Sequence, residues 1–180
     1  MRRRYLALAA VAAAVVILLL VWSRKRTSSP PPEARISAVE KAGPAWAYPD
    51  PERTPGLTNP DIKQANIDDT ICNPGWSTKR IRPPSSYTSK LKREQLLEWR
   101  LAGQPGDYEE DHFIPLELGG NPTDPRNLWP EPYAPQPGAK QKDAVENYLH
   151  HQVCDGAMTL QEAQNAIVTD WYSVYLKIHE

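Results

Sequence analysis

The residues of this chain best suited to chemistry are an aspartate and a histidine that stand next to each other, Asp111 and His112. Histidine is the side chain whose ordinary pKa suits a base near neutral pH, and a carboxylate can hold a hard cation such as Mg²⁺. Hydrolysis of a phosphodiester needs a base to deprotonate water and a cation to neutralise the charge that grows on the phosphate. Two adjacent residues are a weak signal alone, because such pairs occur by chance and a single histidine is more often structural.

The segments around this pair predict the elements that must position it. We expect a strand over residues 108–116, a break at 119–122, a short strand over 127–129 and a helix over 139–153. This order places Asp111 and His112 against the N-terminal end of the helix. In a regular strand the two side chains point to opposite faces, whereas a kink at the strand end lets both face one site.

Further helices are predicted on both sides of this core. Residues 71–84 carry turn signals and are expected to be loop, with a short strand as an addition, and a helix is expected over 89–101. Thr159 and Glu162 form a capping box that begins a last helix with a regular apolar stripe, typical of packing against a core. The stripe consists of Leu160, Ala163, Ile167, Trp171, Val174 and Ile178.

A longer string raises the value of the Asp-His pair. Residues 108–120 read Tyr-Glu-Glu-Asp-His-Phe-Ile-Pro-Leu-Glu-Leu-Gly-Gly, and residues 127–130 read Asn-Leu-Trp-Pro. Here the chain resembles the HNH, or ββα-metal, endonucleases, whose pattern is Asp-His-Ile/Leu-x-Pro, a Gly-Gly loop, Asn-Leu and a helix with a further ligand. Residues 70–171 are also similar to a group of small, often exported bacterial HNH-like proteins. The resemblance implies an α+β fold with a ββα-metal core and flanking helices.

The resemblance also implies roles for individual residues. Asp111 is expected to be a metal ligand and His112 the general base, while Asn127 braces the loop between the strands and so orients the histidine. Three cationic residues are expected to contact the scissile or a neighbouring phosphate: Arg126, Lys140 and Lys142. For the two lysines, exposed decoration of the helix is the alternative.

One position departs from the family pattern. The last motif residue of the family is a His or Asn at the start of the helix, and the alignment places Gly138 there. Gln141 is expected to replace it as a metal ligand through its amide oxygen; water filling the gap, or a weak or lost site, are the alternatives. The metal expected is Mg²⁺, with Mn²⁺ or Zn²⁺ as alternatives, and no organic cofactor is expected.

The N-terminal part of the chain predicts a membrane anchor, residues 1–26, followed by a Pro-rich linker, residues 27–60, and the HNH-like domain, residues 61–180. Residues 5–22 hold no charge and no proline, and as a helix they span about 27 Å. A cleaved signal peptide is the alternative. We expect a single span with the N-terminus in the cytoplasm and the domain outside the membrane.

Cysteine count and charge bear on the compartment and the partner. The two cysteines, Cys72 and Cys154, are expected to form a disulfide in an exported domain, with two buried thiols as the alternative. Residues 61–180 hold twelve Lys and Arg against eighteen acids, so nucleic acid is not bound by bulk charge. A local stretch without acids offers a patch instead, or simply a solvated surface. It contains Lys79, Arg80, Arg82, Lys90, Lys92 and Arg93.

Two functions from different classes follow. The first is a metal-dependent endonuclease that hydrolyses DNA or RNA, with DNA favoured, and uses His112 as its base. The second is a non-catalytic protein of the same fold that binds nucleic acid or a protein partner at the cell surface. Asp111, His112 and Asn127 favour the first function, which is the preferred expectation, and Gly138 favours the second.

Overall fold

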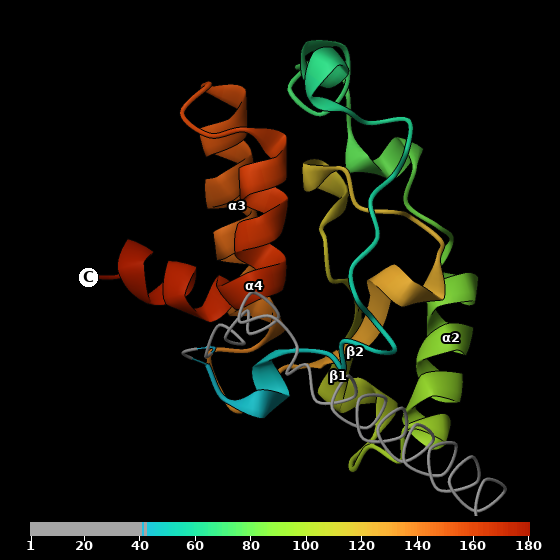
Figure 1. Ribbon diagram of the computed structural model, residues 1–180. Coiled ribbons are helices and arrows are strands. Elements are labelled where there is room, and N and C mark those ends of the chain that lie inside the picture. Colours follow the sequence, from blue (N-terminus) through green and yellow to red (C-terminus); the bar gives the residue numbers. More distant parts are fainter. Residues whose placement is uncertain (1–40, 42) are drawn as a thin grey trace, which may run out of the picture. The chain divides into compact units, whose positions relative to one another are not determined.

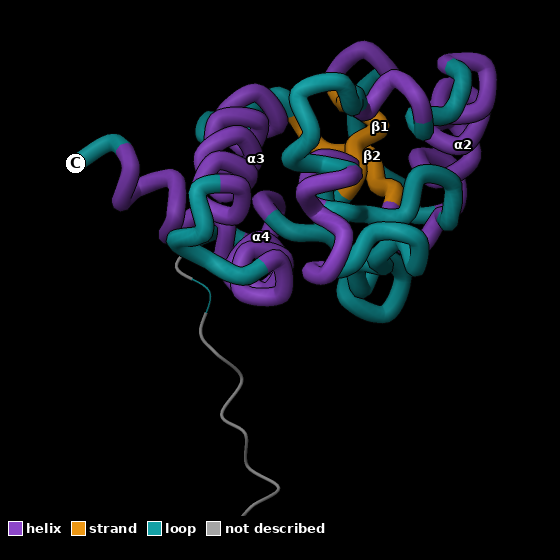
Figure 2. The backbone as a smooth tube through the Cα atoms, turned by 90° about the horizontal axis from the view of Figure 1, so that it is seen from above, coloured by secondary structure: helices purple, strands orange, loops and turns teal. Residues whose placement is uncertain are grey.

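The strand, loop, strand and helix predicted around Asp111 follow one another in the structure, a computed structural model that describes residue 41 and residues 43–180 (Figure 1). The long elements are α2 (Ser85–Glu98), β1 (Tyr108–His112), β2 (Leu128–Pro132), α3 (Ala139–Cys154) and α4 (Leu160–Ile178). β1 and β2 pair antiparallel. α2 lies on one side of this pair and α3 with α4 on the other, as Figure 2 shows from above. The described chain is therefore α+β.

The predicted membrane anchor lies outside the described residues, as does most of residues 27–42. Among the residues that are described, no helix has the length and apolar character of a membrane span. Residues 43–60 of the predicted linker are not a free spacer, because Ala47, Tyr48 and Thr54 are buried. The carbonyl of Ala47 accepts a hydrogen bond from the indole of Trp171 at 2.7 Å. This part of the chain belongs to the domain, which begins before residue 61.

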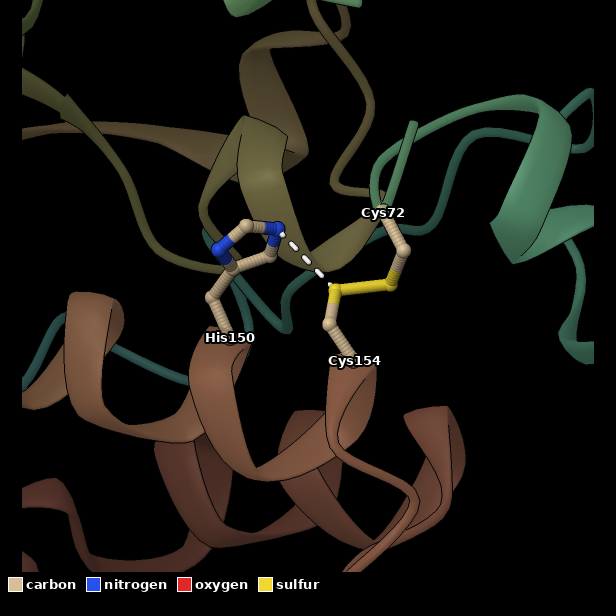
Figure 3. Close-up of side chains that lie close together, drawn as sticks. All are labelled: Cys72, His150 and Cys154. Atoms are coloured by element: carbon tan, nitrogen blue, oxygen red, sulfur yellow. Dashed lines mark hydrogen bonds between the residues drawn. A yellow bond between two sulfur atoms is a disulfide. The ribbon is translucent and has the colours of Figure 1, made fainter. Parts of the chain in front are cut away.

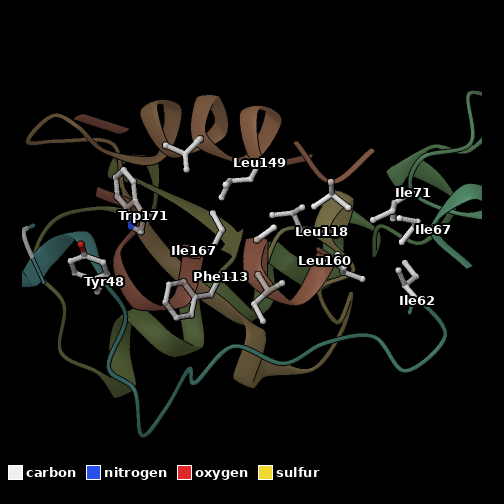
Figure 4. Packing of buried hydrophobic residues seen from close by; sticks show 14 of the residues in the cluster. Tyr48, Ile62, Ile67, Ile71, Phe113, Leu118, Leu149, Leu160, Ile167 and Trp171 are labelled. Atoms are coloured by element: carbon white, nitrogen blue, oxygen red, sulfur yellow. The ribbon is translucent and has the colours of Figure 1, made fainter. Parts of the chain in front are cut away.

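The apolar stripes of α3 and α4 pack against each other, as their spacing predicted (Figure 4). The fully buried apolar residues of the two helices are Val145, Leu149, Val153, Ala163, Ile167 and Trp171. The capping box is confirmed, since Thr159 and Glu162 exchange hydrogen bonds at the start of α4. α4 bends at Asp170, whose backbone is not helical. The core lies between these helices and the loop that joins β1 to β2.

Several element boundaries differ from the prediction, among them the end of α2, which lies at Glu98 rather than at residue 101. β1 ends at His112, because Ile114 gives its N–H and C=O to the side chain of Asn127 and Pro115 has no N–H to pair. β2 continues to Pro132. α2 begins four residues earlier than predicted, directly after the proline pair that ends at Pro84.

A disulfide joins Cys72 to Cys154, as predicted, with their Cα atoms 5.3 Å apart. It ties the loop before α2 to the last residue of α3. The two ends of this link lie far apart in the sequence, so the disulfide closes most of the domain into one covalent ring.

Candidate functional site around Lys142

A fully buried lysine is the centre of the candidate site. Lys142 lies in the first turn of α3, and its side chain has no exposed surface. Its ammonium donates hydrogen bonds to Asp111 Oδ2 at 2.6 Å, to the backbone carbonyl of His112 at 3.2 Å and to Glu146 one turn further along α3. Glu131 of β2 lies 3.8 Å from the same nitrogen. An ammonium has three hydrogens, so these three acceptors use every donor that Lys142 has.

Burial and the ammonium of Lys142 shift the pKa values of the three acids in opposite directions. Burial raises the pKa of Glu131 well above its usual value and raises the pKa of Glu146 to about 8. Burial alone would also raise the pKa of Asp111, but the positive charge of Lys142 holds it below its ordinary value. Burial thus disfavours the ionised forms of Glu131 and Glu146, whereas Asp111 stays the carboxylate that pairs with the ammonium of Lys142.

Neither expectation for Lys142 describes the structure. It is not exposed helix decoration, because its side chain is completely buried. It does not reach a phosphate either, because its three donors are occupied inside the protein. Glu131 and Glu146 are parts of the centre that the sequence did not reveal. The spacing of Lys142 and Glu146, four apart on a predicted helix, is the signal that was available.

His112 is held in one orientation by the loop that follows β1. Its Nε2 lies 3.0 Å from the carbonyl oxygen of Pro122, and because a carbonyl only accepts, this nitrogen carries the proton. Burial lowers the pKa of His112, so the ring is neutral at pH 7 and Nδ1 keeps its lone pair. Those are the properties of a base. The residue is only 2% exposed, however, so water does not reach it freely in this structure.

Asn127 fixes the loop that holds the histidine. Its amide oxygen accepts hydrogen bonds from the backbone N–H groups of Leu57 and Ile114, at 3.2 and 2.9 Å. Its amide nitrogen donates to the carbonyls of Ile114 and Asn121, at 2.9 and 3.0 Å. Asn121 precedes Pro122, the acceptor for His112. The structure thus places Asn127 where it braces the loop and, through it, the imidazole.

The start of α3 is fixed by close packing and by a capping bond. Gly138 precedes the helix, and a Cβ at this position would lie 2.5 Å from the carbonyl oxygen of Pro132 and 2.7 Å from that of Tyr133. Glycine is therefore required by packing, and an asparagine or histidine does not fit there. The amide oxygen of Gln141 accepts a hydrogen bond from the N–H of Gly138 at 2.9 Å. Gln141 caps the helix through this bond, and its role as a ligand stays a prediction.

The other two predicted phosphate contacts lie on the surface. Arg126 is 64% exposed at its side chain and pairs with Asp124 of the same loop, at 2.8 Å. Lys140 is exposed and its ammonium lies 6.0 Å from the centre of the Tyr133 ring. Both are accessible to an anion, and among the described residues neither forms an ion pair with Asp111.

These residues do not fit a divalent cation at Asp111. One of its oxygens is bound to Lys142, Gly138 has no side chain, and the amide oxygen of Gln141 already accepts the capping bond. Among the described residues, the side chains of His, Cys, Asp and Glu that gather closely enough for a metal are Cys72, His150 and Cys154, away from Asp111 in the sequence. The predicted ligand Asp111 is instead neutralised by an internal ammonium.

The arrangement around Lys142 is a closed ion-pair centre, with a neutral, oriented histidine at the next position of β1. Comparisons of this chain with protein-family models, with curated proteins and with solved structures found no match. The resemblance to the HNH nucleases therefore stays a prediction from the motif, and the function has to be inferred from the geometry of the chain's own residues.

Proposed function

We propose that this chain is a non-catalytic protein of ββα type that binds the phosphodiester backbone of nucleic acid. The observation that carries this proposal is the pair of Asp111 with Lys142. The ammonium of Lys142 binds the carboxylate that a catalytic metal would need. Removing this ammonium would leave Asp111 as an unpaired buried charge. Separating such a pair costs about 3–5 kcal/mol, so the centre is a structural one.

A groove of about 290 Å³ beside this centre supports the binding part of the proposal. It is lined by the start of α2 and by β1. The residues from the α2 side are Arg82, Ser85, Thr88, Ser89 and Lys92, and those opposite are Glu109, Glu110 and Tyr133. Arg82 and Lys92 come from the acid-free basic stretch, and no side chain caps α2 at Pro84. Hydroxyls, a guanidinium and open backbone N–H groups are the donors that phosphate oxygens accept.

Glu110 lines this groove without adding a full negative charge to it. Burial raises its pKa to about 8, so the acid is protonated at neutral pH. Both of its oxygens are buried, and among the described residues neither has a hydrogen-bond partner. The positive charge of Arg82 also acts on His112, which places the groove close to the end of β1. The local surface therefore suits an anion although residues 61–180 carry a net negative charge.

The test measures binding and cleavage on the same full-length protein. Fluorescence anisotropy with labelled single- and double-stranded DNA and RNA should show binding that weakens with salt. Arg82→Ala should weaken binding to all sequences alike and lower the slope of log K against log salt by about one. Lys177→Ala, which removes an exposed cation from the end of α4, is the matched control and should change neither quantity. Absence of binding to all four probes at low salt would rule out the binding proposal.

The metal-dependent nuclease is the second candidate, and the orientation of His112 by Pro122 favours it. Plasmid DNA and RNA incubated with the protein and Mg²⁺, Mn²⁺ or Zn²⁺ distinguish the two functions. We expect no cleavage with any of the metals. Metal-dependent cleavage that His112→Ala lowers by about 10²–10⁴, the usual contribution of a general base, would replace the non-catalytic proposal with the nuclease.

A further inference from the structure

Three side chains with metal-binding atoms converge at the C-terminal end of α3 (Figure 3). They are Cys72, His150 and Cys154, all partly exposed, and their ligand atoms lie within 4.8 Å of one another. The two sulfurs are joined as a disulfide. His150 Nε2 lies 3.4 Å from the sulfur of Cys154 and donates a hydrogen bond to the carbonyl of Ile71 at 2.9 Å.

We propose that reduction of this disulfide creates a zinc site, in which Cys72, His150 and Cys154 hold Zn²⁺ and water takes the fourth position. The reductant is a dithiol, which transfers two hydrogens to the cysteine sulfurs and becomes a disulfide itself. Zn²⁺ then displaces the two thiol protons, because thiolates are the ligands. The site is independent of the groove and of the function proposed for it.

The geometry of the histidine and one cysteine already matches tetrahedral zinc. Zn–S bonds of about 2.3 Å and Zn–N bonds of about 2.0–2.1 Å separate the two ligand atoms by roughly 3.6 Å in a tetrahedron. The observed distance from His150 Nε2 to Cys154 Sγ is 3.4 Å. These residues are four apart on α3, so their side chains share one face of the helix. Zinc binding therefore requires the two sulfurs to separate and the imidazole to turn its Nε2 from the carbonyl of Ile71 toward the metal.

The imidazole must change its tautomer when zinc binds. In the disulfide form Nε2 carries a proton, because it donates to the carbonyl of Ile71. A metal needs the lone pair of this nitrogen, so the proton moves to Nδ1. The partial exposure of all three residues gives the ion a path from solvent.

The test uses Co²⁺ as a spectroscopic substitute for Zn²⁺ on the full-length chain. Protein reduced with a phosphine under nitrogen should bind one equivalent of Co²⁺ and show the strong visible absorption of tetrahedral, thiolate-bound cobalt, which Zn²⁺ then removes. The oxidised protein should show no such spectrum. Reduced protein without a tetrahedral spectrum, or the same spectrum from oxidised protein, would overturn the proposal.

Variants separate the site from nonspecific metal binding. His150→Ala should weaken Zn²⁺ binding by more than about tenfold, since loss of even an outer-sphere partner has that effect. His151→Ala is the matched control: it removes the exposed neighbouring imidazole, 5.9 Å away between ring centres, and should leave affinity unchanged. If reduction loosens the fold, circular dichroism replaces the cobalt readout. Zn²⁺ should then restore the native signal in the reduced parent but not in reduced His150→Ala, and equal behaviour of the two would contradict the site.

Discussion

At the scale of single residues, the molecule has replaced what resembles a metal site with an internal ion pair. Lys142 has no exposed side-chain surface and binds Asp111, Glu146 and the backbone of β1 at once. Lysine is rarely buried unless it is paired. The ammonium and the carboxylate therefore depend on each other, and loss of one leaves the other as an isolated buried charge.

Lys142→Met tests this dependence. The variant should lose about 3–5 kcal/mol of unfolding free energy at pH 7, because Asp111 is left charged without its partner. Urea unfolding gives the value. The deficit should narrow at pH 5: without Lys142, burial raises the pKa of Asp111, so the variant gains stability as this acid takes up a proton. In the wild type the pKa of Asp111 lies below its ordinary value, so its contribution is still present at pH 5 and is lost only as the pH falls further.

The control for this prediction lies two positions away on the same helix. Lys140 is exposed, and Lys140→Met should change the unfolding free energy by less than about 0.5 kcal/mol. Equal stabilities of the wild type and Lys142→Met at pH 7 would show that the ion pair contributes nothing to the fold.

The two halves of the pair differ in how far the sequence revealed them. Asp111 and His112 stand in a motif whose order and spacing are specific. Lys142 belongs to no such motif. A Lys and a Glu four apart on a helix give the same sequence pattern whether the pair is exposed or buried. The capping bond of Gln141 to Gly138 could not be predicted either. It depends on the path of the chain before α3, and the sequence pattern does not reveal that path.

At the scale of elements, the loop between β1 and β2 is organised by one side chain. Asn127 is completely buried and makes hydrogen bonds to Leu57, Ile114 and Asn121. Asn127→Ala should cost about 3 kcal/mol or more, because each buried backbone group that is left unpaired costs about 1–3 kcal/mol. Hydrogen exchange should rise at residues 113–127 and at Leu57, while α4 stays protected.

Asn147→Ala is the comparison for that loop prediction. Asn147 is exposed on α3 and donates only to the carbonyl of Asp143. It should leave hydrogen exchange in the β1–β2 loop unchanged. A loop that exchanges equally fast in the wild type and Asn127→Ala would mean that other contacts hold it.

Periodicity predicted the helices better than the strands. Val145, Leu149 and Val153 recur every four residues and are all buried, because one helical face must meet the core. The end of β1 could not be predicted in this way. It is set by hydrogen bonds from Ile114 to Asn127, a residue distant in the sequence, and apolar residues continue past the strand.

At the scale of the whole molecule, the domain is larger than composition indicates. Prolines in residues 43–60 suggested a spacer, yet the segment is bonded to the β1–β2 loop and to α4. The N–H of Asn59 donates to the carbonyl of Gly119 at 2.8 Å, and the indole N–H of Trp171 donates to the carbonyl of Ala47. Proline density reports the absence of helix and sheet but not whether an extended chain is packed or free.

Truncation measures what this segment contributes. A chain that begins at Asp61 should unfold at lower urea than one that begins at Gly43, with a loss of about 3 kcal/mol or more. Burial of one large apolar side chain contributes about 1.5–3 kcal/mol, and the shorter chain lacks Tyr48 and exposes Trp171, which is fully buried. If both chains had the same unfolding midpoint, residues 43–60 would contribute nothing to stability and the domain would begin at Asp61.

The hydrogen bonds between residues 47–48 and α4 also determine which part of the domain is loaded first when the chain is under tension. Trp171 holds the carbonyl of Ala47, and Tyr48 donates to the adjacent Asp170, at the bend of α4. A pull along the chain from its N-terminal side reaches these two bonds before it reaches β1. We therefore expect a load to reach α4 before it reaches the strands and the Lys142 centre.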